Sequence, residues 1–498
     1  MRHWIPSLLI LLTLIPSNIP AEEAPEPRSI ELPEALPEPG PVPPIHPPTA
    51  EVSEVGSGLP LWHLRSGRVP LVSLNLLLRC GSSSDPVGKE GLASLTAAML
   101  DEGAGDRNAV DLAKALDRLG ANLSVSCDVE SCTVSLSVLE RNLSPALDIF
   151  ADVLLRPTFP EDDWDRVKTL RLNNLLQARD RPEHVAREVG SRILFGADHP
   201  YGRSSVGRAE TVEKIELEEA RQFYRESWNA NGAVFASCGN LSSDKLLSLL
   251  VPRFGAWASK RTGTAVYSPP SFPDRARPRV AIVNKPGAPQ TVIRISGPGI
   301  ARRDTDYVPL SLANIAFGGS FTSRLIQNLR ERHGYTYNAR SSFSRRQGPG
   351  LFVSSASVRT NVTAASIAEF EREYLAIRES GITADELRKS RATLRNAVIR
   401  GLGTIDSTAG MFLGMARNGL PPDELSNFVE QAATTTPEAV MAAIQRIIRW
   451  DNTTIVLVGD LESIREQMSE SPVKLDGKIV VVDELGEVIS ELDGFAKK

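Results

Sequence analysis

An internal repeat constrains the fold of this 498-residue chain more than any other feature of its sequence. Three pairs of stretches align at a common offset of 220 residues: SVLERNLSPALDIF (from Ser137) with SVRTNVTAASIAEF (from Ser357), CGNL with VGDL, and GLASLTAAML with SLANIAFGGS. Agreement at one offset in three separate places indicates a duplication. Each half is then one structural unit of about 200 residues, which is the size of a single domain.

Each half shows the residue pattern of a sheet covered by helices. The apolar run at 69–80 predicts a strand, and alternating apolar and polar residues over 122–138 predict a hairpin. Apolar residues recur at helical spacing over 108–120 and stop at a glycine, and further helices are expected at 144–155 and 162–178. The sequence therefore predicts an α+β fold of two homologous sheet-plus-helices halves that enclose a cleft.

Proline-rich stretches mark the borders between segments. Ten prolines lie between residues 21 and 50, a composition that favours an extended tether over a packed core. SPPSFPDRARPR, from Ser268, joins the two halves, and GKIVVVDELGEVI near the C-terminus predicts one or two extra strands. We expect five segments: a signal peptide (1–21), a disordered linker (22–50), an N-terminal half (51–265), a C-terminal half (275–465) and a tail (466–498).

The first residues have the layout of a secretory signal. Arg2 and His3 precede the apolar run WIPSLLILLTLIP, which is short for a membrane span, and cleavage is expected after Ala21. An uncleaved membrane anchor is the alternative. No later apolar run is long enough to cross a bilayer, so we expect an exported protein, periplasmic or extracellular, without stable membrane insertion. With a net charge of −5 and scattered Lys and Arg, nucleic acid is not an expected partner.

Two of the four cysteines lie in the predicted hairpin. Cys127 and Cys132 would face each other across a four-residue loop, on the buried face of the hairpin. In an exported protein they could form a disulfide, and two buried thiols are an equal alternative. Metal binding is a weaker third alternative, because the sequence offers no further ligand nearby.

The six histidines are too widely spaced to form a helical metal-binding motif. No two lie within one helical turn, so the chain contains no H-x-x-E-H or H-x-x-x-H pair. Four of them, His63, His184, His199 and His333, would have to converge from unrelated segments to supply the three protein ligands of a zinc peptidase. No G-x-S-x-G is present, and no cysteine has an evident histidine partner. The residues predict no metal, no cofactor and no catalytic residue of the chain's own.

Four stretches nevertheless resemble one family, the insulinase or pitrilysin type of metallopeptidase, which includes mitochondrial processing peptidase. They are GLASLTAAMLDEG at 91–103, HPYGRSSVGRAETVEKI from His199, the strand ending in CGNL, and GGSFTSRLIQNLRERHGYTY from Gly318. In active members the helix that corresponds to residues 91–100 carries H-x-x-E-H. Its two histidines hold zinc, and the glutamate between them activates the bound water.

The resemblance implies that the zinc site has been lost. It places the two histidine positions at Ser94 and Ala98, the base at Ala97, and the third ligand, a glutamate in the family, at Asn174. None of these side chains can take the corresponding role, so the helix is expected to be part of the core. Asp101 and Glu102 follow the helix and are expected to be ordinary charges at its end.

The second half keeps the family's motif L-R-E-x-x-G-x-x-Y, with Arg330 and Tyr337. The resemblance implies that this pair reaches across the cleft, binds the substrate backbone and helps to stabilise the oxyanion. From the residues alone, Arg330 would pair with a carboxylate of its own helix and Tyr337 would be a hairpin residue. Gly318, Gly319 and Ser320 form a predicted turn, which resembles a shortened form of the glycine-rich substrate loop in the non-catalytic processing-peptidase subunit.

Loss of the zinc ligands beside a retained Arg–Tyr pair resembles the heterodimeric branch of the family. The expected function is that of a non-catalytic subunit of an exported zinc metallopeptidase, which binds and orients peptide or unfolded protein for a homologous zinc-bearing partner. By itself the chain would not be an enzyme. The alternatives are a peptide-binding or structural scaffold with no peptidase partner, and a self-sufficient metallopeptidase that uses unrecognised residues.

Overall fold

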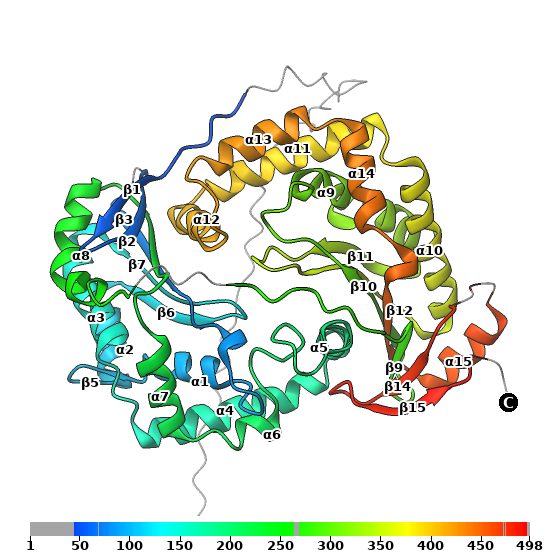
Figure 1. Cartoon of the computed structure of the whole chain (residues 1–498), viewed down its shortest axis with the longest axis horizontal. Helices are drawn as coiled ribbons and strands as arrows, with labels where there is room; N and C mark the ends of the chain where they lie inside the picture. Colours follow the sequence, from blue (N-terminus) through cyan, green and yellow to red (C-terminus); the bar gives the residue numbers. More distant parts are fainter. Residues whose placement is uncertain (1–43, 68, 263–267, 472, 474, 496–498) are drawn as a thin grey trace, which may run out of the picture. The chain divides into compact units, whose positions relative to one another are not determined.

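The computed structural model describes residues 44–67, 69–262, 268–471, 473 and 475–495 (Figure 1). The expected signal peptide and most of the expected linker lie outside the described residues. No described helix is both long enough and apolar enough to cross a membrane. Residues 46–498 form one compact unit, to which the elements below belong.

The first half builds a six-stranded sheet in the order β1-β2-β8-β3-β7-β6. Its strands are β1 (Glu51–Val55), β2 (Leu59–Arg65), β3 (Leu71–Leu78), β6 (Asn122–Cys127), β7 (Cys132–Leu139) and β8 (Val234–Gly239). β2 and β8 run parallel, and the other neighbours are antiparallel. The predicted strand at 69–80 is β3, and the predicted hairpin at 122–138 is β6 and β7. A separate two-stranded ribbon joins β4 (Gly103–Ala104) to β5 (Arg107–Asn108).

The second half repeats this topology in a seven-stranded sheet, β11-β12-β10-β13-β9-β14-β15. Its strands are β9 (Val280–Asn284), β10 (Gln290–Pro298), β11 (Thr336–Phe343), β12 (Leu351–Arg359), β13 (Thr454–Gly459), β14 (Ile479–Val482) and β15 (Val488–Leu492). From β9 to β11 the order matches that from β2 to β6 in the first sheet, and β9 runs parallel to β13 as β2 does to β8. Beyond β9 the two sheets differ, because β14 pairs parallel with β9 whereas β1 pairs antiparallel with β2. The predicted duplication is therefore confirmed, and β14 and β15 are the strands expected near the C-terminus.

Helices connect the strands of both sheets. In the first half they are α1 (Leu92–Met99), α2 (Ala109–Leu119), α3 (Leu143–Leu155), α4 (Glu161–Arg179), α5 (Pro182–Phe195), α6 (Ala209–Val212), α7 (Leu217–Ser227) and α8 (Ser243–Ala258). In the second half they are α9 (Tyr307–Asn314), α10 (Thr363–Ser380), α11 (Ala384–Gly401), α12 (Ile405–Arg417), α13 (Glu424–Thr434), α14 (Pro437–Ile447) and α15 (Leu461–Glu470), with the π-helices η3 (Ile315–Gly319) and η4 (Ile326–Arg332). Short 3₁₀ turns are η1 (Ser82–Ser84), η2 (Glu140–Asn142), η5 (Thr360–Val362) and η6 (Trp450–Asn452).

Local sequence explains where these helices begin and end. At the start of α2, the Asn108 side chain accepts a hydrogen bond from the backbone N of Asp111 at 2.9 Å. The helix ends at Gly120, whose φ of 56° is the left-handed conformation that glycine adopts without strain. α11 begins with a capping box in which Thr383 and Glu386 bond each other's backbone N–H.

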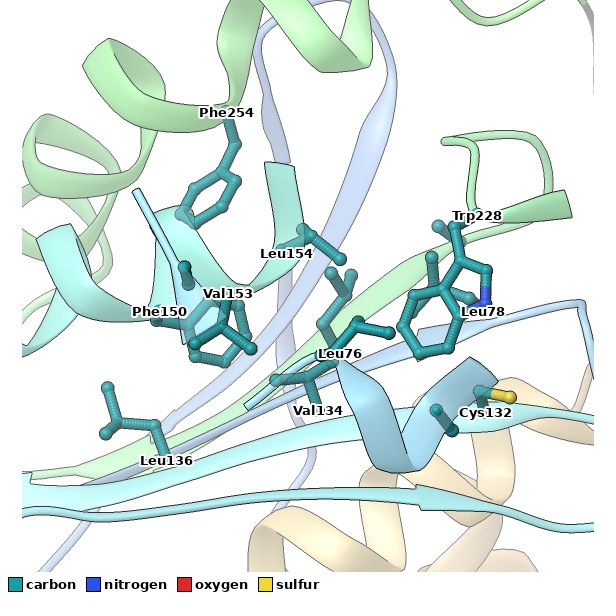
Figure 2. Close-up of a cluster of buried hydrophobic side chains, with 14 of the residues drawn as sticks. Leu76, Leu78, Cys132, Val134, Leu136, Phe150, Val153, Leu154, Trp228 and Phe254 are labelled. Atoms are coloured by element: carbon teal, nitrogen blue, oxygen red, sulfur yellow. The ribbon is translucent and has the colours of Figure 1, made fainter. Parts of the chain in front are cut away.

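One face of each sheet is covered by helices of its own half. In the first half, Phe150, Val153 and Leu154 of α3 and Phe254 of α8 belong to one buried cluster with Leu76 of β3 (Figure 2). The rings of Phe150 and Phe254 meet edge to face, with centroids 5.8 Å apart. In the second half, side chains of α9, α10 and α14 form the corresponding cluster with the strands.

The opposite face of each sheet is covered by a helix of the other half. α5 packs against β10 and β13, where Val185 and Val189 join a cluster of valines from the second sheet. α12 packs against β8 and β3, where Phe412 joins Trp62 and Leu77 of the first sheet (Figure 1). Adding the repeat offset of 220 to the residue numbers of α5 gives 402–415, a range that overlaps α12. The two helices are therefore equivalent in the repeat. The two halves thus exchange equivalent helices.

Because of this exchange, a mutation that removes a buried side chain of α12 should strongly lower the stability of the fold. Phe412 is fully buried, so Phe412→Ala should lower the free energy of unfolding by about 3–5 kcal/mol, because it removes packed apolar volume between α12 and the first sheet. Chemical denaturation followed by circular dichroism measures the change. Phe321→Ala is the control, since the Phe321 side chain is 68% exposed, and it should change stability by less than about 0.5 kcal/mol. Equal denaturation midpoints for the two variants would contradict the exchange.

Candidate functional site

Helices α1 and α4 carry the four positions at which the resemblance places the zinc site. Ser94 and Ala97 are buried in α1 and Ala98 is half-buried there, while Asn174 lies exposed on α4. The two helices pack against each other. As predicted, α1 is largely buried and carries no ionisable side chain.

The side chain of Arg171 lies between these helices. It is one turn before Asn174 on α4, and its Nη1 donates to Ser94 Oγ at 2.6 Å and to the carbonyl oxygen of Val206 at 3.1 Å. Ser94 Oγ itself donates to the carbonyl oxygen of Gly91 at 3.0 Å, which leaves its lone pairs to accept from the guanidinium. Burial lowers the pKa of Arg171, but a guanidinium remains charged in proteins. A fixed positive charge therefore stands at Ser94, where the resemblance places a zinc ligand.

The residues present do not fit a zinc ion. Zinc sites in proteins use thiolate, imidazole or carboxylate ligands, and the serine, alanines and asparagine at the four positions supply none of these. Within the described parts of the chain, no group of three or more His, Cys, Asp and Glu side chains could hold a metal ion. The guanidinium of Arg171 would also repel a dication. Glu102, just beyond α1, is engaged in an ion pair with Arg166 of α4.

A buried carboxylate caps the start of α1. Asp85 accepts from the backbone N of Gly91 at 2.8 Å and of Ala93 at 2.7 Å, which satisfies donors that a helix leaves unpaired at its first turn. Burial raises the pKa of Asp85 to about 7, against the opposing effect of these hydrogen bonds. Gly91 has φ of +101°, and a Cβ there would lie 2.9 Å from the carbonyl oxygen of Val206. Glycine is thus required where the loop at 199–207 closes over the helix.

A cavity of about 520 Å³ adjoins Arg171 and Asn174. We call it the arginine cavity, because its lining includes Arg171, Arg181, Arg187, Arg203 and Arg346. Glu188 is the one carboxylate among the described residues that line it. Arg346 belongs to the second half, so both halves contribute to the wall.

Sequence analysis did not single out any of these arginines. The available signal was the spacing of Arg171 and Asn174, because residues three apart lie on the same face of a helix. An arginine on an amphipathic helix is ordinarily a solvated surface charge, and the sequence does not show that α1 and the 199–207 loop bury this one.

The Arg–Tyr motif spans η4 and the edge strand β11, which pack together. Arg330 Nε lies 3.3 Å from Glu331 Oε1, which is the pairing within its own helix that the residues alone predicted. Its guanidinium carbon also lies 4.7 Å from the ring centre of Phe321. The Arg330 side chain is 36% exposed and Tyr337 is 90% exposed, so both hydrogen-bond donors remain accessible to a ligand.

Tyr337 lines a second cavity, of about 340 Å³, together with Arg294 and Arg340. Asn174 lines the arginine cavity instead, so Tyr337 and Asn174 contribute to different cavities. Both cavities border α5, which supplies Ala186 to the one at Tyr337 and Arg187 to the arginine cavity.

The glycines before the motif do not form the predicted turn. Gly318 and Gly319 are the last residues of the π-helix η3, and Ser320 follows in an extended conformation. Gly318 is buried, and a Cβ there would lie 2.5 Å from the backbone N of Ser341 on β11. Close packing against β11 therefore explains the glycine at 318, whereas Gly319 is exposed and Ser320 is half-buried.

The four cysteines are free thiols in the structure. Cys127 lies directly opposite Cys132 in the β6–β7 pairing, as predicted, but it is half-buried, whereas Cys132 is fully buried. The thiol of Cys132 donates to the carbonyl oxygen of Cys80 at 3.2 Å. Burial, with the neighbouring thiols of Cys127 and Cys80, raises the pKa of Cys132. The sequence left open whether Cys127 and Cys132 form a disulfide or remain thiols, and in the structure they are thiols.

The second half has its own cavity at the place equivalent to the lost zinc site. This cavity of about 720 Å³ is lined by Asn314 and Leu394, which lie at the repeat offset from Ser94 and Asn174. An amide and an aliphatic side chain are likewise not zinc ligands of the usual kind.

Both halves of the chain match known protein families. Residues 65–201 match the family model described as insulinase (peptidase family M16), and residues 214–394 match that of the peptidase M16 inactive domain. The uncharacterized zinc protease SCO5738 of Streptomyces coelicolor is 25% identical over 374 residues, which cover 74% of this chain and 80% of the relative. The non-peptidase homolog YmxG of Helicobacter pylori is 25% identical over 341 residues, with 68% and 77% covered.

Two solved structures share the fold. A crystal structure of a peptidase M16 inactive domain from Pseudomonas fluorescens has a TM-score of 0.77 and 26% identity, and the match covers 82% of this chain and 98% of that one. A protease from Helicobacter pylori has a TM-score of 0.73 and covers 83% and 100%, at 17% identity, which is a likeness of fold alone.

Rebuilding the zinc site should require the removal of Arg171. The four changes that would supply the family's donors are Ser94→His, Ala97→Glu, Ala98→His and Asn174→Glu. Adding Arg171→Ala to them should tighten zinc binding at least about tenfold, because a positive charge about 5 Å from the ion costs on the order of 1–3 kcal/mol. Titration calorimetry measures the two affinities.

The control for this series is Arg179→Ala, which removes a more distant arginine of the same helix, paired with Glu210. It should leave the zinc affinity of the four-change variant within about twofold. Equal zinc affinity with and without Arg171 would contradict the assignment of its guanidinium to the zinc position.

The raised pKa of Asp85 predicts a pH-dependent stability. The pKa of Asp85 is about 7 in the folded chain, against an ordinary value of 3.8. At a pH between these two values, the folded state binds a proton that the unfolded state has lost. The free energy of unfolding should therefore fall as pH rises from about 4 to about 7. Asp85→Asn keeps a capping oxygen but cannot ionise, and it should remove about 1–3 kcal/mol of this fall.

Denaturant unfolding across this pH range measures the effect. Asp111→Asn, at an exposed carboxylate in the first turn of α2, is the control and should follow the wild-type profile. An unchanged profile in Asp85→Asn would show that the Asp85 carboxyl titrates normally in the folded chain.

Proposed function

The chain belongs to the insulinase family, peptidase family M16, and we propose that it is the non-catalytic subunit of an exported heterodimeric zinc metallopeptidase. In this role it binds and orients an extended peptide. A homologous partner that carries H-x-x-E-H supplies the zinc and the hydrolytic chemistry. Without that partner the chain cleaves no peptide.

One contrast between the two halves carries the proposal. In the first half, Arg171 and Ser94 are hydrogen-bonded to each other where active members of the family bind zinc. In the second half, Arg330 and Tyr337 keep the family's substrate-binding positions and remain accessible. An aromatic ring that lies almost wholly in water contributes little to folding and is suited to contact with a ligand.

Both sheets offer an edge to an extended peptide. β6 lies at one edge of the first sheet and β11 at one edge of the second. Main-chain hydrogen bonds to such an edge bind a peptide without regard to its side chains. Tyr337 lies on β11, so its hydroxyl and the guanidinium of Arg330 would donate hydrogen bonds to a peptide carbonyl that becomes anionic in the partner's reaction.

A scaffold role without a peptidase partner is the second candidate. It is favoured by the contact of Arg330 with Glu331, which engages the Nε of the guanidinium and partly offsets its charge. The name of the Helicobacter pylori relative, a non-peptidase homolog, points the same way. Export in either case rests on the signal-like sequence at 1–21, which lies outside the described residues.

Reconstitution with a homologue that carries an intact H-x-x-E-H tests the subunit role. The two chains should co-purify and cleave peptides together. Arg330→Ala and Tyr337→Phe should each lower kcat/KM of the complex by about 10- to 1000-fold, because each removes a donor to the oxyanion, while the complex still forms. Arg332→Ala is the matched control, an exposed arginine of the same π-helix, and should retain activity within about twofold.

Each alternative function has its own signature in this experiment. Full activity of the Arg330 and Tyr337 variants, or the absence of partner-dependent cleavage, would contradict the subunit role and favour the scaffold role. Cleavage by the isolated chain with one bound zinc would instead identify a self-sufficient peptidase.

A further inference from the structure

The arginine cavity carries an excess of positive charge that the described residues do not neutralise. Two of its five arginines have a carboxylate nearby: Arg187 lies 3.5 Å from Glu188, and Arg203 lies 3.9 Å from Glu90. The other three form no ion pair within the described part of the chain. One of these three, Arg346, lies with its guanidinium carbon 5.0 Å from the ring centre of Tyr201.

The side chain of Arg203 is largely buried. Its side chain is 8% exposed, and its Nη1 donates to the backbone carbonyl of Asp85 at 2.9 Å. Its Nε is buried without a hydrogen-bond partner among the described residues. A guanidinium on a cavity wall carries a fixed positive charge and is suited to an anionic ligand.

The adjoining cavity at Tyr337 is lined by two arginines, Arg294 and Arg340, and by one carboxylate among the described residues, Glu183 of α5. Arg294 of β10 lines the cavity at Tyr337, and its Nε is also buried without a partner in the described chain. Burial, and then the positive charges of Arg187 and Arg340, lower the pKa of Arg294 to about 10. Arg187 also lines the arginine cavity.

The size and chemistry of the arginine cavity favour a carboxylate as the ligand. About 520 Å³ is in the range of pockets that hold small ligands or a few side chains. Guanidinium groups bind carboxylates through paired, charge-assisted hydrogen bonds, which are the strongest hydrogen bonds available to a peptide. The adjoining cavity contains Tyr337, where the proposed function places the peptide backbone.

We propose that the arginine cavity binds a carboxylate of the bound peptide, so that this chain selects peptides with glutamate or aspartate beside the strand held at Tyr337. The inference rests on the proposed function, since it extends that peptide site along α5. On this proposal, the region where active members of the family bind zinc holds the Arg171 guanidinium as its cation, and the cavity beside it binds an anion.

Binding of labelled peptides to the isolated full chain tests the proposal. The probes are two amide-blocked peptides of about twelve residues, identical except that three central glutamates in one are glutamines in the other. We expect the glutamate peptide to bind at least about tenfold more tightly at low salt, with a smaller preference at high salt. Fluorescence anisotropy measures both affinities.

Neighbouring arginines provide a matched pair of variants. Arg346 lines the arginine cavity, whereas Arg345 lines the 720 Å³ cavity of the second half. Arg346→Gln should reduce the preference for the glutamate peptide to less than about threefold, and Arg345→Gln should preserve it. Arg181→Gln, at an exposed position of the same cavity, repeats the test should Arg346→Gln fail to fold. An unchanged preference in both cavity variants would overturn the location.

A third peptide separates the two sources of a carboxylate. It is the glutamine peptide with a free C-terminal carboxylate in place of the amide. Tighter binding of this peptide, lost in Arg346→Gln, would support the cavity and assign it to the peptide terminus. Equal affinity for all three peptides would overturn the proposal.

This test and the test of the subunit role fail independently. The binding assay needs no partner, so a preference for carboxylates without partner-dependent cleavage would support the cavity and contradict the subunit role. Cleavage by the complex without any such preference would support the subunit role and contradict the cavity.

Discussion

The exchange of α5 and α12 is the constraint on which the rest of the structure depends. Each central sheet is apolar on both faces, and the helices of its own half cover one of them. A helix from the other half covers the second face, with Phe412 on the first sheet and Val185 and Val189 on the second. Apolar faces of this size cannot be left in water, so the two halves stabilise each other. Because α5 is held in this way, one helix borders both the arginine cavity and the cavity at Tyr337.

A hydrogen-bonded guanidinium stands at Ser94, where the resemblance places a zinc ligand. Arg171 bonds Ser94 and the carbonyl oxygen of Val206, so it ties α1, α4 and the loop over them together as a metal ion would. A guanidinium cannot polarise water for attack on a peptide, but it can bind a carboxylate. The second half, in contrast, keeps Arg330 and Tyr337 exposed.

Much of this fold could be predicted from the sequence, because the repeat and the strands leave regular patterns of residues. The repeat at one offset predicted the two matching sheets, and alternation over 122–138 predicted the β6–β7 hairpin. The exchange of α5 and α12 could not be predicted, because an apolar helix face shows that it is buried but not against which sheet. The partner of Arg171 depends on packing between distant segments, and the π-helix that ends at Gly319 depends on a hydrogen-bond register that residue types do not encode.

The zinc content of the isolated chain tests the central claim most directly. The purified protein would be saturated with zinc, desalted, and analysed by mass spectrometry for metal per chain. With Arg171 at Ser94 and no set of three metal ligands among the residues that the structure describes, the account predicts far less than one zinc per chain. One tightly held zinc per chain, located between α1 and α4 by anomalous scattering, would contradict it.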